Sequence, residues 1–318
     1  MKKTTGLIVL AVLLIVMISG CRTIENEKIK VVCTTFAAYD WTSRIIGEDN
    51  TDIDTVLLCD STADMHSYQA SADDIIELSL CDILIYTGGR SEKWVSDAVA
   101  SNEKAEIINL LEILGTSAKI ERHTEGMETG EHSSSGHEDT EYDEHVWLSL
   151  KNAVLFCNKI ADTLAAADPK NSQLYLQNAK QYIKELEELD SLYQSTVTES
   201  KKDTLIFADR FPFVYLMDDY GIKYYAAFPG CSTETQASFE TILFLAQKAD
   251  ELSVNFLLTV DGSQSAIAAA VAENTHNDDM QILSMDSMQT GGQQEIQQGK
   301  TYLSVMRSNL DIIKTALN

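Results

Sequence analysis

Two histidines stand in distinctive local sequences, far apart in the chain. His66 lies in the segment 65–74 (MHSYQASADD), and His145 lies in the segment 143–148 (DEHVWL). A neutral imidazole nitrogen is a good ligand for zinc and its first-row neighbours, and two imidazoles supply half of a tetrahedral site. Asp143 could orient one of the rings from behind. The two segments together predict a metal site.

Both segments resemble the signature segments of the metal-binding lipoproteins that serve zinc and manganese ABC importers, the ZnuA/TroA-like family. The resemblance spans residues 29–318, nearly the whole mature chain. It implies an α/β fold of two similar lobes, each a short parallel sheet with flanking helices, joined by one long rigid helix. It also implies a monomeric receptor, not an enzyme, that delivers a divalent metal to a membrane permease. Within that family His66 and His145 would bind the metal in the cleft between the lobes.

The resemblance is weaker for the other metal ligands. The family's third ligand is a histidine or glutamate, and Ala208 occupies that place here. Asp209 is the nearest substitute, although a shift of one residue along a strand turns the side chain to the opposite face. The family's fourth ligand is an aspartate after the last strand, which is Asp286 in this chain. Glu234 and Glu240 are further candidates.

Zinc is the metal that this ligand set favours, while an oxygen-richer shell would accommodate manganese or iron. The acidic segment 121–144 carries His123, His132 and His137 and almost no large apolar side chain. We expect it to be mobile and to bury no core. It could collect metal at low affinity, or it could be a plain solvated loop.

A short apolar run near the N-terminus predicts export. The run 7–18 follows two lysines, is too short for an ordinary membrane span and is typical of a signal peptide. The sequence ISGC at 18–21 resembles a bacterial lipobox, in which Cys21 becomes the lipidated first residue once residues 1–20 are removed. Residues 21–28 would then tether the protein to the outer face of the cytoplasmic membrane, at the cell surface. An ordinary signal peptide or an anchor helix are the alternatives.

The composition is that of a soluble, acidic body. The chain has 318 residues, of which 44% are hydrophobic, enough for two domain-sized cores. Its net charge of -25 disfavours binding to nucleic acid and concentrates cations near the surface.

The cysteines do not form a zinc knuckle, because none of the six belongs to a C-x-x-C pair. Cys33 and Cys157 stand among apolar residues and should be small core side chains. Cys59 and Cys231 each follow the second strand of a predicted lobe. They could form a disulfide between the lobes or add a thiolate to the metal site, or each could be a core or free thiol.

Strands and helices alternate along the chain, which predicts parallel sheets with helices on both faces. We expect one lobe at 29–167 and another at 203–318. Strands are predicted at 29–35, 55–58, 83–86, 107–110, 205–208, 224–228, 256–260 and 282–285. Helices are predicted at 37–47, 73–79, 92–100, 213–220, 238–249, 265–274 and 295–317.

A long helix should link the lobes over residues 168–202. Asp168 and Pro169 favour a helix start, as an N-cap followed by proline at the first helical position. About thirty residues without proline or glycine follow, which would span about 45 Å. So stiff a connection predicts no large closure of the lobes.

Other functions would need other features. A secreted metallohydrolase is disfavoured because the chain has no H-E-x-x-H, G-x-S-x-G or P-loop motif. The same scaffold could bind a chelated metal or a small anionic organic ligand, with Arg210 as the anion contact; alternatively, Arg210 neutralises a carboxylate. A role in cell adhesion is compatible with metal transport and has no signature in these residues.

Overall fold

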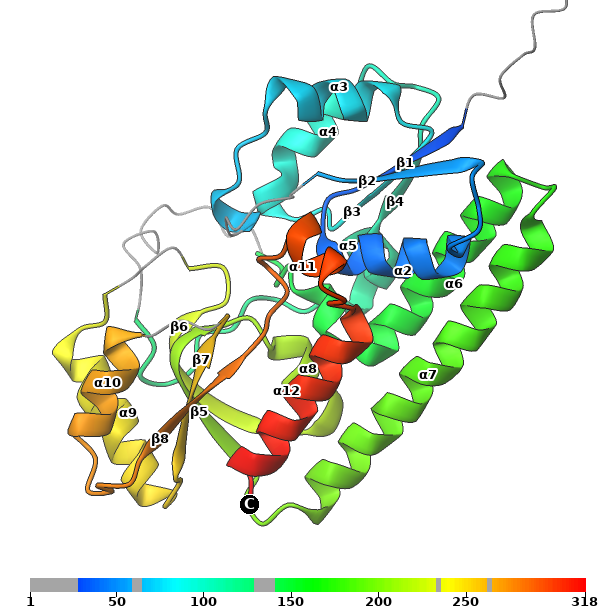
Figure 1. Cartoon of the computed structure of the whole chain (residues 1–318). Coiled ribbons are helices and arrows are strands. Elements are labelled where there is room, and N and C mark those ends of the chain that lie inside the picture. Colours follow the sequence, from blue (N-terminus) through cyan, green and yellow to red (C-terminus); the bar gives the residue numbers. More distant parts are fainter. Residues whose placement is uncertain (1–27, 59–64, 129–140, 233–235, 262–264) are drawn as a thin grey trace, which may run out of the picture.

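Two four-stranded parallel sheets form the framework of the molecule (Figure 1). The computed structural model describes residues 28–58, 65–128, 141–232, 236–261 and 265–318. The first sheet has the order β2-β1-β3-β4 and the second the equivalent order β6-β5-β7-β8. The strands are β1 (Ile29–Cys33), β2 (Ile53–Leu57), β3 (Ile83–Tyr86), β4 (Glu106–Asn109), β5 (Thr204–Phe211), β6 (Lys223–Pro229), β7 (Phe256–Val260) and β8 (Gln281–Met285).

Helices pack on both faces of each sheet, so the predicted α/β class with two similar lobes is confirmed (Figure 1). The first lobe contains α2 (Phe36–Ile46), α3 (Ala72–Leu80), α4 (Lys93–Val99), α5 (Leu110–Leu114) and α6 (Leu150–Ala167). The second contains α8 (Val214–Tyr220), α9 (Phe239–Glu251), α10 (Ala266–Glu273), α11 (Gln293–Gln297) and α12 (Tyr302–Ala316). The 18-residue helix α6 was not predicted from the sequence.

Strand β1 shows how both faces of a sheet are buried. Successive side chains of a strand point to opposite faces. Val31 and Cys33 belong to the core that includes α2 and α6, whereas Val32 packs with residues of α3 and α4. All three are completely buried, which confirms Cys33 as a core residue, and Cys157 of α6 is equally buried.

Helix α7 (Ser172–Glu199) joins the lobes and packs against α2 and α6 on one side and α8 and α12 on the other. Its 28 residues span about 42 Å. The helix begins later than predicted, because Asp168 ends α6 instead of capping α7. The Asp168 carboxylate accepts hydrogen bonds from the Asn171 amide and the Tyr175 hydroxyl, so it is already used at this corner.

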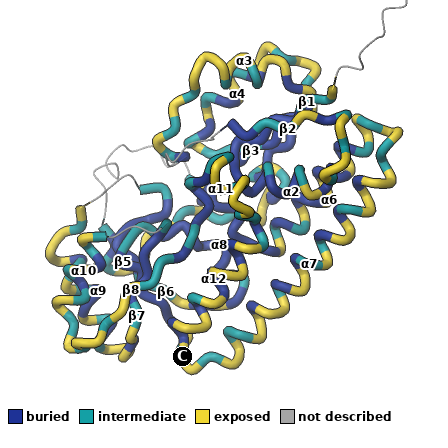
Figure 2. Tube along the Cα trace, in the orientation of Figure 1, coloured by how far each residue is buried: buried dark blue, intermediate teal, exposed yellow. Residues whose placement is uncertain are grey.

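One apolar core runs through both lobes. It includes Trp41 and Phe156 of the first lobe and Phe207 and Ile313 of the second. Trp41 also contacts Tyr302 of α12, with 5.1 Å between ring centroids. Figure 2 shows the buried strands of both lobes and the exposed outer turns of α7. Since a wide hinge motion would open this core, the lobes are coupled by packing as well as by α7.

The predicted closing helix is in fact two helices. Helix α11 ends at Gln297, and Gly299 has a φ of 92°, a left-handed conformation that glycine adopts without steric cost. Thr301 then caps α12, because its hydroxyl accepts a hydrogen bond from the Ser304 backbone N–H. The break places Lys300 Nζ 2.9 Å from the Asp286 carboxylate.

The start of the acidic segment packs against the second lobe. Met127 is buried, and the Glu128 N–H donates to the Ala227 carbonyl of β6. The Thr241 hydroxyl of α9 donates to the Gly126 carbonyl. The expectation that this segment buries no core is therefore wrong for residues 121–128.

Several sequence predictions concern residues beyond those the structure describes. They are the signal peptide, the lipidated Cys21 and the side chains of Cys59, His132, His137 and Glu234. His123 is exposed. In the described part of the chain, no helix has the length and apolar character needed to cross a membrane.

Candidate metal centre

Three potential metal ligands from different parts of the chain converge on one point. His66 lies in the 3-10 turn η1 (Met65–Ser67), His145 directly precedes η5 (Val146–Leu148), and Cys231 follows β6. One ligand atom of each residue lies within 4.8 Å of the other two. The structure thus brings the two predicted histidines together and adds a thiol from the second lobe.

The distance between the two imidazoles suits a shared metal ion. His66 Nε2 lies 3.2 Å from His145 Nε2. Two nitrogens that bind one tetrahedral zinc ion at about 2.0–2.1 Å are about 3.3–3.4 Å apart. One ion could therefore bind both rings with little movement of either.

Asp143 fixes the orientation of His145, as the sequence predicted. Its Oδ1 accepts a hydrogen bond from the His145 backbone N–H at 2.9 Å and lies 3.0 Å from Nδ1 of the ring. Nδ1 therefore carries a proton, and in the neutral ring Nε2 presents its lone pair to the site. Burial alone would lower the pKa of His145, but the Asp143 carboxylate, together with the charges of Glu144 and Glu121, outweighs it and the pKa is raised.

Ser91 and Glu144 hold His66. The Ser91 hydroxyl oxygen lies 2.6 Å from His66 Nδ1, and the Ser91 backbone N–H donates to Glu144 Oε1 at 2.9 Å. The other carboxylate oxygen of Glu144 lies 3.8 Å from His66 Nδ1. These contacts turn Nε2 of His66 toward His145.

Gly230 lets the turn that carries Cys231 approach the imidazole. A Cβ atom at this position would lie 2.8 Å from the Phe211 carbonyl oxygen and 3.0 Å from His145 Cε1. Both distances are shorter than ordinary van der Waals contact. Any side chain at Gly230 would therefore push Cys231 away from the histidines.

The surroundings of the thiol are electronegative. Burial raises the pKa of Cys231 well above its ordinary value, and the carboxylates of Glu121, Asp143 and Glu144 raise it further. One buried oxygen each of Asp143 and Glu144 accepts no hydrogen bond. A divalent cation would be attracted by these carboxylates and would favour the thiolate form of the cysteine. The charges therefore suit a cation and not an anion.

Removing the charge behind His145 should weaken metal binding. We expect Asp143→Asn to lower zinc affinity by about 10- to 100-fold, the usual effect of losing a group that orients a metal-bound histidine. Competition with a zinc chelator would measure the change. Asp162→Asn, at an exposed position of α6, is the matched control. Equal affinities of the two variants would contradict the role of Asp143.

Glu92, next to Ser91, should make the stability of the folded protein depend on pH. Its Oε2 accepts hydrogen bonds from the backbone N–H groups of Thr87 and Gly88, and burial raises its pKa from 4.5 to about 7. At pH values between 4.5 and about 7, the Glu92 carboxyl keeps its proton in the folded protein and releases it in the unfolded chain. The contribution of Glu92 to stability therefore falls as pH rises from 4.5 to about 7.

Glu92→Gln removes this titration. The free energy of unfolding of the variant, minus that of the wild type, should be larger at pH 8 than at pH 4 by roughly 3 kcal/mol. Urea unfolding at the two pH values would measure it. The same difference at both pH values would show that Glu92 does not titrate in this way.

The two carboxylates predicted from the second half have other partners. Asp209 accepts hydrogen bonds from the backbone N–H groups of Arg210 and Val260. Asp286 accepts one from the Met288 N–H at 2.7 Å and pairs with Lys300 at 2.9 Å. Neither belongs to the group formed by the histidines and the thiol. Their ligation stays a prediction.

The local structure of β5 partly explains why Asp209 lies outside that group. Its register with β6 shifts between Phe207 and Arg210, and the Ala208 side chain is buried in the core beneath α9 and α10.

Burial raises the pKa of Asp261 to about 6, and the charge of Arg210 opposes this rise. Arg210 thus acts on a carboxylate, one of its two predicted roles. Glu240 is exposed on α9.

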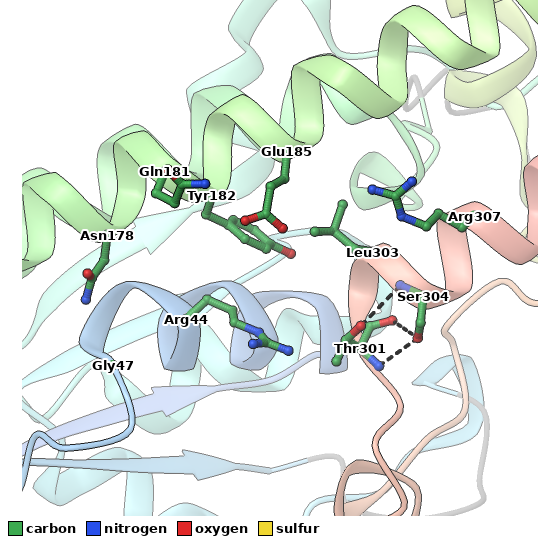
Figure 3. Close-up of a pocket in the computed structure, with 10 residues that line it drawn as sticks. All are labelled: Arg44, Gly47, Asn178, Gln181, Tyr182, Glu185, Thr301, Leu303, Ser304 and Arg307. Carbon is green, nitrogen blue, oxygen red and sulfur yellow. Dashed lines mark hydrogen bonds between the residues drawn. The ribbon is translucent and has the colours of Figure 1, made fainter.

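A cavity of about 470 Å³ lies elsewhere, between α2, α7 and α12 (Figure 3). Arg44, Tyr182, Glu185 and Arg307 are among its lining residues, and neither histidine of the metal centre is. The two sites are distinct. A metal ion needs only a few donor atoms at bonding distance and no cavity of this size.

The known proteins whose sequences match this chain include zinc-uptake and zinc-binding proteins. Residues 31–316 match the family ZnuA, described as zinc-uptake complex component A, periplasmic. Zinc-binding protein AdcA of Streptococcus pyogenes is 26% identical over 300 residues, which cover 92% of this chain and 56% of the relative. The high-affinity zinc uptake system protein ZnuA of Bacillus subtilis is 27% identical, and the match covers 99% of this chain and 98% of the relative. The chain thus spans only about half the length of the streptococcal relatives.

Solved structures show the same fold. The metal-dependent lipoprotein YcdH of Bacillus subtilis has a TM-score of 0.73 at 25% identity, covering 91% of this chain and 99% of that one. The Zn(II)-bound ZnuA-like domain of Streptococcus pneumoniae AdcA has a TM-score of 0.71 at 22% identity, with coverages of 91% and 99%. The predicted two-lobed architecture is therefore confirmed by both.

Proposed function

Since this chain belongs to the ZnuA family of zinc-uptake components, we propose that it captures zinc as the binding component of an ABC importer. The observation that carries the proposal is the convergence of His66, His145 and Cys231 from both lobes. The family consists of transport components, so the chain is not an enzyme. Its zinc is cargo, to be released to the permease.

The thiol is what favours zinc over the other predicted metals. A thiolate is a soft ligand, which zinc accepts readily, whereas manganese prefers carboxylate, carbonyl and water oxygens. Two imidazoles and one thiolate are also a common set of zinc ligands. We therefore propose a preference for zinc over manganese and ferrous iron.

The cellular location proposed for this protein follows from the signal peptide and lipobox predicted at its N-terminus. Lipidation of Cys21 would anchor the protein to the outer face of the cytoplasmic membrane, where a permease could receive the ion. A relative from Streptococcus pneumoniae, 24% identical over 314 residues and 99% of this chain, is itself a zinc-binding lipoprotein. That name supports the anchored form proposed here.

Metal titration of residues 22–318, stripped of metal, tests the proposal. We expect one zinc ion per chain and much weaker binding of manganese. Equal affinity for the two metals, or no zinc binding, would overturn it. The same titration of Asp209→Asn and Asp286→Asn tests the two predicted carboxylate ligands, because loss of a ligand should weaken binding as strongly as loss of a histidine.

A further inference from the structure

A short stretch of the first lobe, residues 119–122, lies beside the metal centre and contacts the second lobe. Its backbone pairs with the segment that leads to His145, because the Glu121 N–H donates to the Glu141 carbonyl at 2.9 Å. The position of this stretch is therefore linked to that of the buried imidazole.

Ion pairs fix the same stretch on helix α8. Lys119 Nζ lies 2.9 Å from Asp218 Oδ2, and the Arg122 guanidinium binds both oxygens of that carboxylate, at 2.8 and 2.7 Å. A bidentate pair of this kind holds both partners in one geometry. The Lys119 backbone N–H also donates to the Tyr215 hydroxyl at 2.9 Å. Glu121 lies between these two anchored residues, so its backbone has little freedom to move.

The Glu121 side chain extends from this stretch to the turn that carries the thiol. Its Oε1 accepts a hydrogen bond from the Cys231 backbone N–H at 2.8 Å. The neighbouring Gly230 packs so closely against Phe211 and His145 that a side chain would not fit there. The turn is thus held by close packing at one residue and by a charge-assisted hydrogen bond at the next.

We propose that Glu121 is the positioning residue that makes Cys231 a zinc ligand. A carboxylate of the first lobe then decides whether a thiol of the second lobe reaches the ion. The inference rests on the proposed function, since it concerns the site formed by His66, His145 and Cys231. A thiolate suits zinc better than manganese, so Glu121 also sets the preference between these metals.

The reach and the charge of Glu121 have separable effects. Glu121→Asp keeps the negative charge, but its carboxylate is one methylene too short to accept the Cys231 N–H in the same place. Glu121→Gln keeps an oxygen acceptor at full length and loses the charge. If the hydrogen bond positions the thiol, Glu121→Asp should lose the sulfur ligand and Glu121→Gln should retain it.

Cobalt(II) in place of zinc reports on the sulfur directly, through the sulfur-to-cobalt charge-transfer band. We expect the band in the wild type and in Glu121→Gln, and its loss or strong reduction in Glu121→Asp. Zinc affinity of Glu121→Asp should fall by about 10- to 100-fold, the usual effect of losing a group that orients a ligand. Its manganese affinity should change little. In Glu121→Gln, zinc and manganese should weaken to a similar degree, because only the charge is lost.

Glu128→Asp is the matched control. Glu128 accepts the Ser238 backbone N–H, so it also ties the first lobe to a backbone N–H of the second, away from the thiol. This variant should keep the cobalt band and the wild-type preference for zinc.

The outcomes separate this inference from the proposed function. An intact band and an unchanged zinc preference in Glu121→Asp would overturn the role of Glu121. Equal loss of the band in Glu121→Gln would also overturn it, since the acceptor is retained there. Absence of the band in the wild type would instead refute Cys231 as a ligand and with it the three-residue site.

Discussion

Replacing His145 with alanine should abolish tight zinc binding, with a loss of affinity well above 100-fold. His145 is completely buried, and both of its ring nitrogens are committed, Nδ1 to Asp143 and Nε2 to the site. Its loss removes one ligand and leaves the buried Asp143 carboxylate without the imidazole, with the backbone N–H of residue 145 as its remaining partner. Zinc affinity measured by competition with a chelator would show the change.

His276 offers a matched control for that experiment. Its ring is exposed and pairs with Asp250 on the surface of the second lobe. His276→Ala should therefore bind zinc as the wild type does. Wild-type affinity in His145→Ala would contradict the proposed centre directly, provided that circular dichroism shows the variant folded.

Replacing Cys231 with serine should weaken zinc binding by about 100-fold and change the order of metals. A hydroxyl is a poorer and harder ligand than a thiolate, so cadmium and zinc should lose more affinity than manganese. Titration of the three metals against wild type and variant would give the change in preference.

Cys81 serves as the control for this second variant. It is buried in the first lobe, in the cluster beneath α3 and α4. Cys81→Ser should leave the relative affinities of the three metals unchanged, whatever its effect on stability. An unchanged order of metals in Cys231→Ser would show that the thiol does not bind the ion.

The two histidines could be predicted because each lies in a distinctive local segment. Cys231 remained one of several hypotheses, since its approach to His145 depends on the pairing of β5 with β6 and on the space left by Gly230. Cys231 is a free thiol in the structure, and the proposed pairing with Cys59 lies outside the described residues. Gln289, whose side-chain nitrogen lies 2.9 Å from His145 Nε2, had no signal in the sequence.

The strands were easier to predict than the helices. Runs such as 83–86 and 256–260 are almost entirely apolar, because both faces of a parallel sheet are buried, and the strands match these bounds. Helix α6 was missed although its buried face is apolar. The break between α11 and α12 depends on the conformation of Gly299 and the cap at Thr301.

X-ray absorption at the zinc edge of the loaded protein tests the central claim most directly. Two imidazoles and one thiolate around a single ion predict nitrogen or oxygen neighbours at about 2.0 Å and one sulfur at about 2.3 Å. The sulfur contribution should disappear in Cys231→Ser. A wild-type shell of nitrogen and oxygen alone would contradict the site described here.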